Sequence, residues 1–361
     1  MPSLLDPIQI GAMTLPNRVI MSPLTRLRGT PDHIPTELMI EYYTQRATAG
    51  LIISEGIPVV PQGVGYANVP GIWSAQQTEA WMLVTESVRR AGGRIFAQLW
   101  HVGRISDPRF LEGKTPVAPS AIAPAGHVSL VRPITEYVTP RALNRSEIPG
   151  IVEGFRHGAE NAKIAGFDGV EIHGANGYLI DQFLQDGSNH RTDEYGGTIE
   201  NRARLMLEVA DAVISVWGAK RVGMHLAPRG DSHDMHDSNP SATFGYVACE
   251  LGRRGLAFLC AREYFGQDRL GPQLKMQFGG VYIANEKYTQ ALAEQVIHDG
   301  EADAVAFGQL FIANPDLAVR FANNAPLNTP DPATYFTPGP HGYIDYPALS
   351  APQEVMALAS E

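Results

Sequence analysis

Eight short apolar runs, separated by segments with helical periodicity, most constrain what this chain can fold into. The runs are Val19–Ser22, Leu51–Glu55, Ile95–Trp100, Gly169–His173, Val222–Ala227, Leu256–Ala261, Val281–Asn285 and Ala304–Gly308. Most are unbroken apolar stretches, which is typical of parallel strands covered on both faces. Strand and helix alternating eight times predict an α/β fold, a single (β/α)8 TIM barrel.

Helix-end signals support this alternation. Ser74 and Gln77 have the spacing of a capping box, and the helix that they open ends at Gly92. Apolar residues also recur at helical spacing before Gly166 and Gly218. The structural alternative is an open, doubly wound sheet. That fold more naturally has a glycine-rich turn after its first strand, and the Ser-Pro-Leu-Thr sequence at 22–25 is not such a turn.

The domain organisation follows from the same rhythm. No second domain and no other repeat interrupts it, so we expect residues 1–361 to form a single domain. One segment is an exception, because about 102–147 is rich in Pro, Gly, Ser and Ala and is long for a loop. It follows the third run, on the catalytic face of such a barrel. We therefore expect this insertion to be a lid.

Composition excludes several partners and compartments. The net charge is −10, and no cluster of Lys or Arg offsets it, which argues against nucleic acid or an anionic membrane as a partner. No apolar run approaches the roughly 18 residues of a membrane helix, and the first residues do not resemble a signal peptide. Cys249 and Cys260 form no disulfide framework. We expect a cytoplasmic protein.

The residues at the ends of the runs are polar or aromatic and mostly uncharged. They include no paired carboxylates for glycoside hydrolysis, no clustered metal ligands, no nucleophile elbow and no phosphate-binding Walker loop. After the fourth run come His173, Asn176 and Tyr178. A neutral imidazole and a carboxamide can both donate to one oxygen, and a nearby tyrosine can deliver a proton. The alternative is that His173 caps the barrel and Tyr178 packs against the insertion.

Long motifs then identify a family. The run His173–Leu184, continuing through Ser188–Arg202, closely resembles the old yellow enzyme family of FMN-dependent ene-reductases. Further segments resemble the same family in the right order along the chain, namely 17–26, 98–104, 307–317 and 342–347. Thr25 stands where another branch of the family has cysteine, so the chain is nearest the classical branch.

The resemblance implies a reaction and its residues. It implies FMN as cofactor, NADPH or NADH as electron donor, and an electrophilic alkene, an α,β-unsaturated carbonyl or nitro compound, as substrate. Hydride would pass from FMN to Cβ and a proton from Tyr178 to Cα, while His173 and Asn176 bind the activating oxygen. The residues expected at the cofactor are Pro23, Thr25, Gly56, Gln98, His225, Glu286, Lys287, Gly308 and Gln309. Tyr66, Trp73, Trp100 and Phe336 are expected walls of the substrate pocket, with core packing as the alternative.

Three positions depart from the family pattern. Many relatives have an arginine in the fifth strand facing flavin N1 and O2, where this chain has His225. We expect that histidine to be only partly protonated near neutral pH, so that it stabilises reduced flavin less. The seventh strand usually ends in Asn-Gly-Gly, but here Glu286 and Lys287 follow the asparagine. Binding of phosphate by their amides requires ordinary dihedral angles, with Glu286 pointing away from the anion. Gln309 replaces a phosphate-binding arginine.

Two hypotheses account for these departures. In the first, Lys287 supplies the charge that Gln309 lacks, and Arg262 or Arg229 adds more. In the second, flavin binding is lost, and a flavin-free barrel binds or isomerises an unsaturated carbonyl ligand. We favour the first, because the set of oxygen-binding and proton-donating residues is complete.

Overall fold

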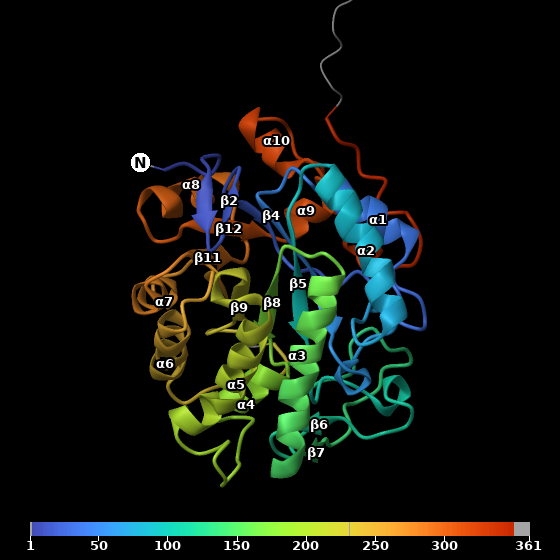
Figure 1. The fold of residues 1–361 in the computed structure, drawn as a ribbon, viewed down its shortest axis with the longest axis vertical. Coiled ribbons are helices and arrows are strands. Elements are labelled where there is room, and N and C mark those ends of the chain that lie inside the picture. The colour runs from blue at the N-terminus through green and yellow to red at the C-terminus, as the bar shows by residue number, and fades with distance from the viewer. Residues whose placement is uncertain (1, 231, 350–361) are drawn as a thin grey trace, which may run out of the picture.

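Eight parallel strands close into a barrel in the computed structural model, which describes residues 2–230 and 232–349. The strands, in their order around the barrel, are β10 (Phe258–Arg262), β11 (Tyr282–Asn285), β12 (Ala304–Phe307), β3 (Val19–Met21), β4 (Leu51–Pro58), β5 (Ile95–Trp100), β8 (Gly169–Gly174) and β9 (Val222–Leu226). This arrangement confirms the predicted TIM barrel (Figure 1). The second strand is longer than predicted, because the pairing of β4 with β5 shifts register between Ile53 and Gly56 and then continues to Pro58.

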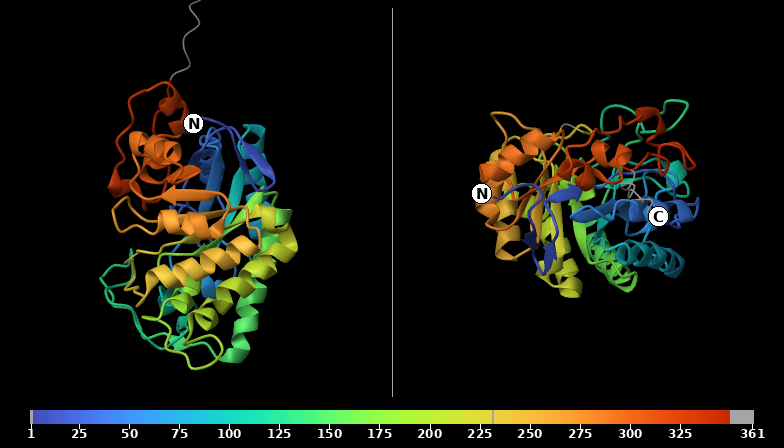
Figure 2. Two further views of the ribbon diagram at one scale, coloured as in Figure 1. Left: turned by 90° about the vertical axis from the view of Figure 1, so that its left-hand side faces the viewer. Right: turned by 90° about the horizontal axis from the view of Figure 1, so that it is seen from above.

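Helices form the outer layer around these strands (Figures 1 and 2). They are α1 (Glu37–Thr44), α2 (Ala75–Arg90), α3 (Ile148–Ile164), α4 (Leu179–Leu184), α5 (Ile199–Trp217), α6 (Pro240–Arg253), α7 (Gly271–Phe278), α8 (Gln290–His298), α9 (Gln309–Ala313) and α10 (Leu317–Ala322). The predicted capping box is present, since Ser74 Oγ accepts a hydrogen bond from the backbone N–H of Gln77. No helix among the described residues is both long enough and apolar enough to cross a membrane.

Apolar side chains close the barrel at the N-terminal ends of its strands. Ile20, Ile53, Phe96 and Phe258 fill the interior, and a hairpin of β1 (Ile8–Ile10) and β2 (Met13–Leu15) packs against the same cluster. The barrel interior is therefore occupied at the N-terminal ends of its strands. A site can form only at the opposite, C-terminal ends.

The insertion after β5 is not a structureless loop. It contains β6 (Val117–Ala118) and β7 (Arg141–Ala142), which pair with each other. Its Val102, Ile105 and Val128 pack in one cluster with Trp100 and Tyr178. The insertion thus supports the wall beside Tyr178, and its role as a lid stays a prediction.

Two hydrogen-bond networks, each centred on one arginine, fix loops around the barrel. Arg26 donates to Tyr42 Oη at 3.1 Å and to the Gly342 carbonyl at 2.7 Å, and the rings of Tyr42 and Tyr343 stack at 4.1 Å. These contacts hold the C-terminal segment, red in Figure 1, against α1. Since Arg26 follows Thr25, they also fix the loop after β3.

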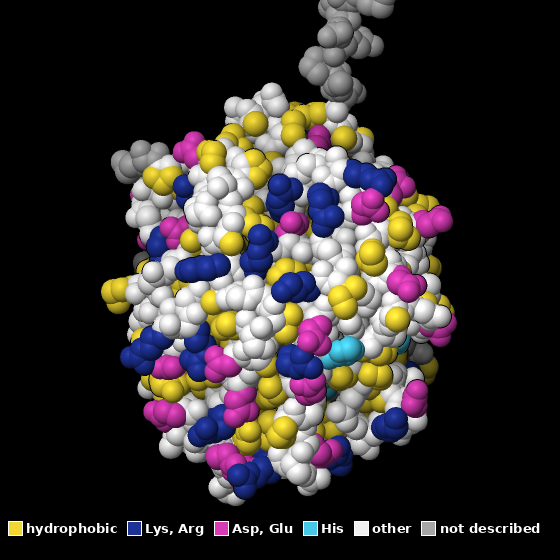
Figure 3. Space-filling model, viewed as in Figure 1, with side chains coloured by type: hydrophobic (Ala, Val, Ile, Leu, Met, Phe, Trp, Pro, Cys, Tyr) yellow, Lys and Arg dark blue, Asp and Glu magenta, His cyan; other side chains and the backbone are white. Residues whose placement is uncertain are grey.

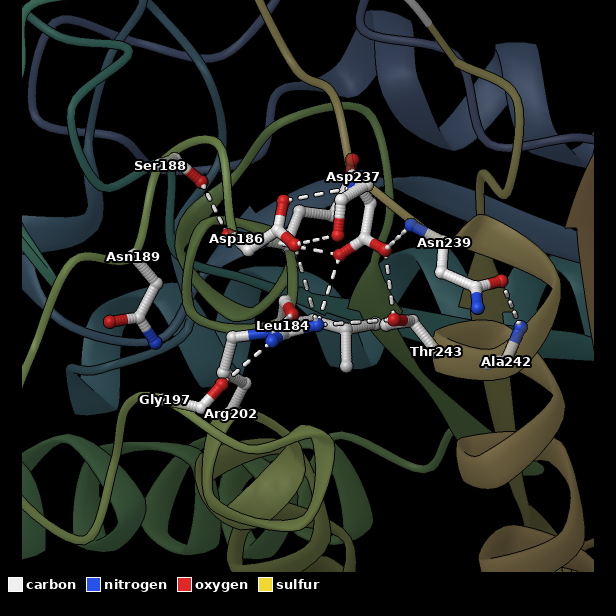
Figure 4. Close-up of polar contacts among 12 residues, drawn as sticks. Leu184, Asp186, Ser188, Asn189, Gly197, Arg202, Asp237, Asn239, Ala242 and Thr243 are labelled. Carbon is white, nitrogen blue, oxygen red and sulfur yellow. Dashed lines mark hydrogen bonds and ion pairs between the residues drawn. The ribbon is translucent and has the colours of Figure 1, made fainter.

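The second network lies around Arg202, at the end of the longest family motif (Figure 4). Its guanidinium donates to the Leu184 carbonyl at 2.8 Å, to Asp237 Oδ2 at 3.2 Å and to Thr243 Oγ1 at 3.1 Å. These bonds tie the end of α4 to the loop between β9 and α6. On the face shown in Figure 3, basic and acidic side chains are interspersed rather than segregated.

Candidate functional site

A cavity of about 650 Å³ lies at the C-terminal ends of the barrel strands. Thirteen of the predicted site residues line it: Pro23, Thr25, Gly56, Gln98, Trp100, His173, Asn176, Tyr178, His225, Glu286, Lys287, Gly308 and Gln309. The fold therefore gathers residues from seven of the eight strands, or from the loops that follow them, around one space.

The predicted aromatic walls lie partly elsewhere. Tyr66 stacks on Trp100 with ring centroids 5.6 Å apart, and it sits behind the cavity wall rather than on it. Trp73 packs beside His33, and Phe336 is exposed, so neither of these two lines the cavity. Of the four aromatic residues, Trp100 alone ends a barrel strand, whereas Tyr66 and Trp73 lie in the connection from β4 to α2 and Phe336 lies in the C-terminal segment.

His173 is held by aromatic stacking. Its ring is nearly parallel to those of Trp100 and His225, with centroid distances of 6.0 and 5.5 Å, and lies edge-on to Tyr178 at 5.0 Å. Burial, together with the charge of nearby groups such as Arg262, lowers the pKa of His173 well below its usual range. The imidazole is therefore neutral near pH 7, and it carries one N–H donor.

Tyr178 keeps its proton. It precedes α4, and its hydroxyl lies 3.0 Å from the hydroxyl of Tyr66. Burial, with a smaller contribution from Tyr66, raises the pKa of Tyr178 well above its usual value. A hydroxyl in this state can give a proton only to a partner that becomes strongly basic.

A buried network lies next to His173, whose ring stacks on that of His225. Gln98 Nε2 donates to Glu171 Oε2 at 2.7 Å and lies 3.2 Å from His225 Nδ1. Burial raises the pKa of Glu171 to about 8, and burial and Arg262 lower the pKa of His225 to about 3. Both groups are therefore neutral near pH 7. The prediction that His225 is partly protonated near neutral pH is wrong, because desolvation disfavours its charged form.

The same network leaves donors and acceptors for a ligand. With Gln98 donating to His225 Nδ1, the neutral ring carries its proton on Nε2, which has no partner among the described residues. Gln98 Oε1 likewise accepts no hydrogen bond from the described part of the chain. Gly56 also lines the cavity, and a side chain is excluded there because a Cβ would lie 2.6 Å from the Trp100 ring.

The turn after β11 has an unusual backbone. Glu286 has φ of 102° and Lys287 has φ of 58°, both in the region that favours glycine. The condition of ordinary dihedral angles, set above for phosphate binding by the amides of these two residues, is therefore not met. Conformations of this kind cost about 1–3 kcal/mol and persist only where surrounding contacts enforce them. The turn keeps a glycine-type geometry with two charged residues in it.

The two charged side chains of this turn have different surroundings. Glu286 Oε1 accepts from Arg262 Nη2 at 2.9 Å, so its carboxylate is neutralised within the cavity wall. Lys287 is exposed, and its Nζ lies 4.7 Å from the centre of the Tyr264 ring. Arg229 bonds Asp268 at 2.9 Å and does not line the cavity.

Arg262 lines the cavity, although the sequence analysis named it only as a possible additional charge for the phosphate. It ends β10, and its Nη1 also donates to Asn176 Oδ1 at 2.9 Å and to Ser232 Oγ at 3.2 Å. An arginine at the last position of a barrel strand was the available signal, because that position faces the catalytic side. The partners of such a long side chain depend on rotamers, which the sequence does not specify.

Known proteins resemble this chain over nearly its whole length. The family model described as "NADH:flavin oxidoreductase / NADH oxidase family" matches residues 3–328. A putative 12-oxophytodienoate reductase 3 of Oryza sativa subsp. japonica is 43% identical, covering 97% of this chain and 94% of the relative. A probable flavin mononucleotide-dependent alkene reductase of Leishmania infantum is 42% identical, with 96% and 97% covered.

Solved structures agree with these relatives. The old yellow enzyme homologue from Zymomonas mobilis superposes with a TM-score of 0.94 at 46% identity, covering 96% of this chain and 100% of that one. Morphinone reductase in complex with tetrahydroNAD superposes with a TM-score of 0.93 at 48% identity, with 97% and 98% covered.

Proposed function

Because this chain belongs to the NADH:flavin oxidoreductase / NADH oxidase family, as an FMN-dependent ene-reductase of the old yellow enzyme type, we propose that it reduces the activated C=C bond of α,β-unsaturated carbonyl or nitro compounds. The flavin-free alternative is not pursued, because the family and the alkene reductase among the relatives use flavin. Bound FMN supplies the hydride for Cβ, which it obtains from NADH or NADPH.

The residues of the cavity fit FMN. The unpartnered N–H of His225 and the free Oε1 of Gln98 offer one donor and one acceptor, which suit the alternating acceptors and donor of a flavin pyrimidine edge. Thr25 adds a hydroxyl and Pro23 an apolar surface to the lining of the cavity. For the phosphate we propose Lys287 as the cation, with backbone N–H groups near Gly308 and Gln309. The Arg262 ion pair removes the charge of Glu286 that would oppose the anion.

His173 and Asn176 are the proposed donors to the substrate oxygen. Negative charge grows on that oxygen when hydride reaches Cβ, and preorganised donors aimed at it lower the barrier. Neutral His173 offers an N–H, and the amide of Asn176 offers another. His173 is already held between two rings, so the imidazole loses little further conformational freedom when the substrate binds.

Tyr178 is the proposed proton donor to Cα. The observation that carries the proposal is its position: a hydroxyl with a raised pKa lines the cavity 3.0 Å from Tyr66 and beside the His173 ring. The carbanionic Cα formed on hydride addition is basic enough to take this proton. Tyr66 then stabilises the phenolate that remains by donating its own hydrogen bond.

The test is Tyr178→Phe, followed separately in the two half-reactions. We expect reduction of the flavin by NADH or NADPH to be nearly unchanged, and reduction of a cyclic enone to slow by roughly one to four orders of magnitude. Nitroalkenes, whose nitronate is stable without protonation at Cα, should suffer less. Tyr66→Phe is the comparison variant: it keeps the Tyr178 hydroxyl but removes the donor to its phenolate, so enone reduction should slow less than in Tyr178→Phe. Equal losses in both half-reactions of Tyr178→Phe would mean that this residue only shapes the cavity.

A further inference from the structure

Arg262 connects two loops across the cavity. Its guanidinium contacts Asn176, after β8, through Nη1 at 2.9 Å, and Glu286, after β11, through Nη2 at 2.9 Å. The side chain lines the cavity and is 33% exposed. Ser232 Oγ accepts a third bond from Nη1 at 3.2 Å. The arginine is therefore fixed by three different segments of the chain.

These contacts determine which way the amide of Asn176 faces. A guanidinium has donors and no acceptor, so it can bond only the oxygen of the carboxamide. With Oδ1 held by Arg262, the Nδ2 group of Asn176 has no acceptor among the described residues, and Asn176 lines the cavity. The backbone of Asn176 is fixed as well, since it has φ of 59° and its carbonyl lies 2.7 Å from His233 Nδ1.

The ion pair between Glu286 and Arg262 explains why the turn after β11 has a strained backbone. Its φ of 102° places a carboxylate, rather than the bare backbone of a glycine, within 2.9 Å of Arg262. An arginine in a half-buried wall needs such a counter-charge. The strain at Glu286 is thus linked to the position of Arg262, and through it to Asn176.

We propose that Arg262 is a positioning residue for the reduction: held by Glu286, it fixes the amide of Asn176 with its N–H groups toward the substrate oxygen and strengthens them as donors. The inference rests on the proposed function, in which Asn176 binds that oxygen. A positive group bonded to the carbonyl end of an amide polarises its N–H end, because hydrogen bonds in a chain reinforce one another. Without Arg262 the amide can rotate by half a turn. Its oxygen would then face the substrate oxygen, and the two oxygens would repel each other.

The experiment measures phenolate binding to the FMN-loaded protein, because a phenolate oxygen resembles the developing enolate. Binding of p-hydroxybenzaldehyde is read from the change in flavin absorbance for Arg262→Met, Asn176→Ala and the double variant, at saturating FMN. We expect Arg262→Met to weaken binding roughly ten- to a hundred-fold. The double variant should bind about as well as Asn176→Ala alone, because Arg262 acts through that amide. Arg262→Lys, which keeps a donor, should recover part of the affinity.

Arg229→Met is the matched control, since Arg229 is bonded to Asp268 outside the cavity, and it should bind phenolate normally. Unchanged affinity in Arg262→Met would overturn the inference. So would losses that multiply in the double variant, because the arginine would then attract the ligand directly. If Asn176→Ala itself binds phenolate normally, the proposed oxygen site fails, and the inference fails with it.

Discussion

The two sides of the cavity differ in how their side chains are held. On the side after β8, the rings of Trp100, His173 and Tyr178 support one another by stacking and edge-on contacts. On the side after β10 and β11, Arg262 and Glu286 are held by an ion pair, and the backbone there has positive φ. The first side matches the family motif residue by residue, whereas the second carries the departures at Glu286 and Lys287.

The difference indicates which part of the reaction allows variation. Proton transfer and oxygen binding need groups placed within a few tenths of an ångström, and stacked rings provide that placement at little cost in conformational entropy. Binding of a phosphate needs positive charge and N–H groups, which several arrangements can supply. We therefore expect substitutions of the β8-side groups, and of Arg262, which positions Asn176 among them, to reduce catalysis. Substitutions at Lys287 should instead change cofactor binding.

The largest effect should follow from removing a donor on the β8 side. His173→Ala and Asn176→Ala should each slow enone reduction by about 10²–10³-fold, as for the loss of one donor to a developing oxyanion. Phenolate binding should weaken in parallel, whereas FMN affinity should remain close to that of the parent. Stopped-flow rates and flavin titration measure the two. Normal rates with weakened FMN binding would contradict the division between the two sides.

A smaller effect is expected on the β11 side. If Lys287 carries the charge that Gln309 lacks, Lys287→Ala should weaken FMN binding roughly ten- to a hundred-fold, the loss of one charge-assisted hydrogen bond. Gln309→Ala should change little, and Gln309→Arg should restore binding to the Lys287→Ala protein. Flavin release followed by fluorescence compares the three variants. Unchanged affinity in Lys287→Ala would instead make backbone N–H groups the main anchor.

The sequence predicted the barrel because its signals are local. Parallel strands buried on both faces must be apolar throughout, so each strand is visible as a short run. Helix ends depend on caps and glycines a few residues apart, and the capping box at Ser74 appears as predicted. The second strand was predicted to end at Glu55, but a register shift against β5 lets the pairing continue to Pro58. Its polar residues Ser54 and Glu55 are buried. Ser54 Oγ accepts from the Gln98 N–H and Glu55 from Tyr43 Oη, partners that lie far away in sequence.

The sequence predicted thirteen of the residues that line the cavity, but not their charge states. Motif positions at strand ends bring the right residues together, because strand ends converge in a barrel. That His225 is neutral depends on its burial over Glu171, and the direction of Arg262 depends on Glu286 and Asn176. These properties come from contacts between strands. The second part of the longest motif, Ser188–Arg202, does not line the cavity, and Arg202 there ties two loops together, so this part of the resemblance reflects the fold rather than the chemistry.

The smallest effect tests why a histidine is tolerated at position 225. Glu171 lies beneath it, with 3.7 Å between Glu171 Oε2 and His225 Nδ1, and the pKa of about 8 keeps this carboxyl protonated near pH 7. An arginine at position 225 would favour the ionised form and lower that pKa. Much of the added positive charge would then be cancelled by the carboxylate below it.

We therefore expect His225→Arg alone to raise the FMN reduction potential only slightly at pH 7, and His225→Arg combined with Glu171→Gln to raise it by about 30–60 mV. The larger shift corresponds to one charge-assisted hydrogen bond to reduced flavin, since about 30 mV equals 1.4 kcal/mol for a two-electron couple. The dependence on pH has a definite sign. Below the lowered pKa of Glu171 the carboxyl is again protonated, so the single variant should approach the double variant as the pH falls. Redox titration with reference dyes at several pH values measures this convergence. Equal potentials for the two variants at every pH would mean that Glu171 does not compensate charge at this position. The chain would then do without the arginine that many relatives have here for another reason.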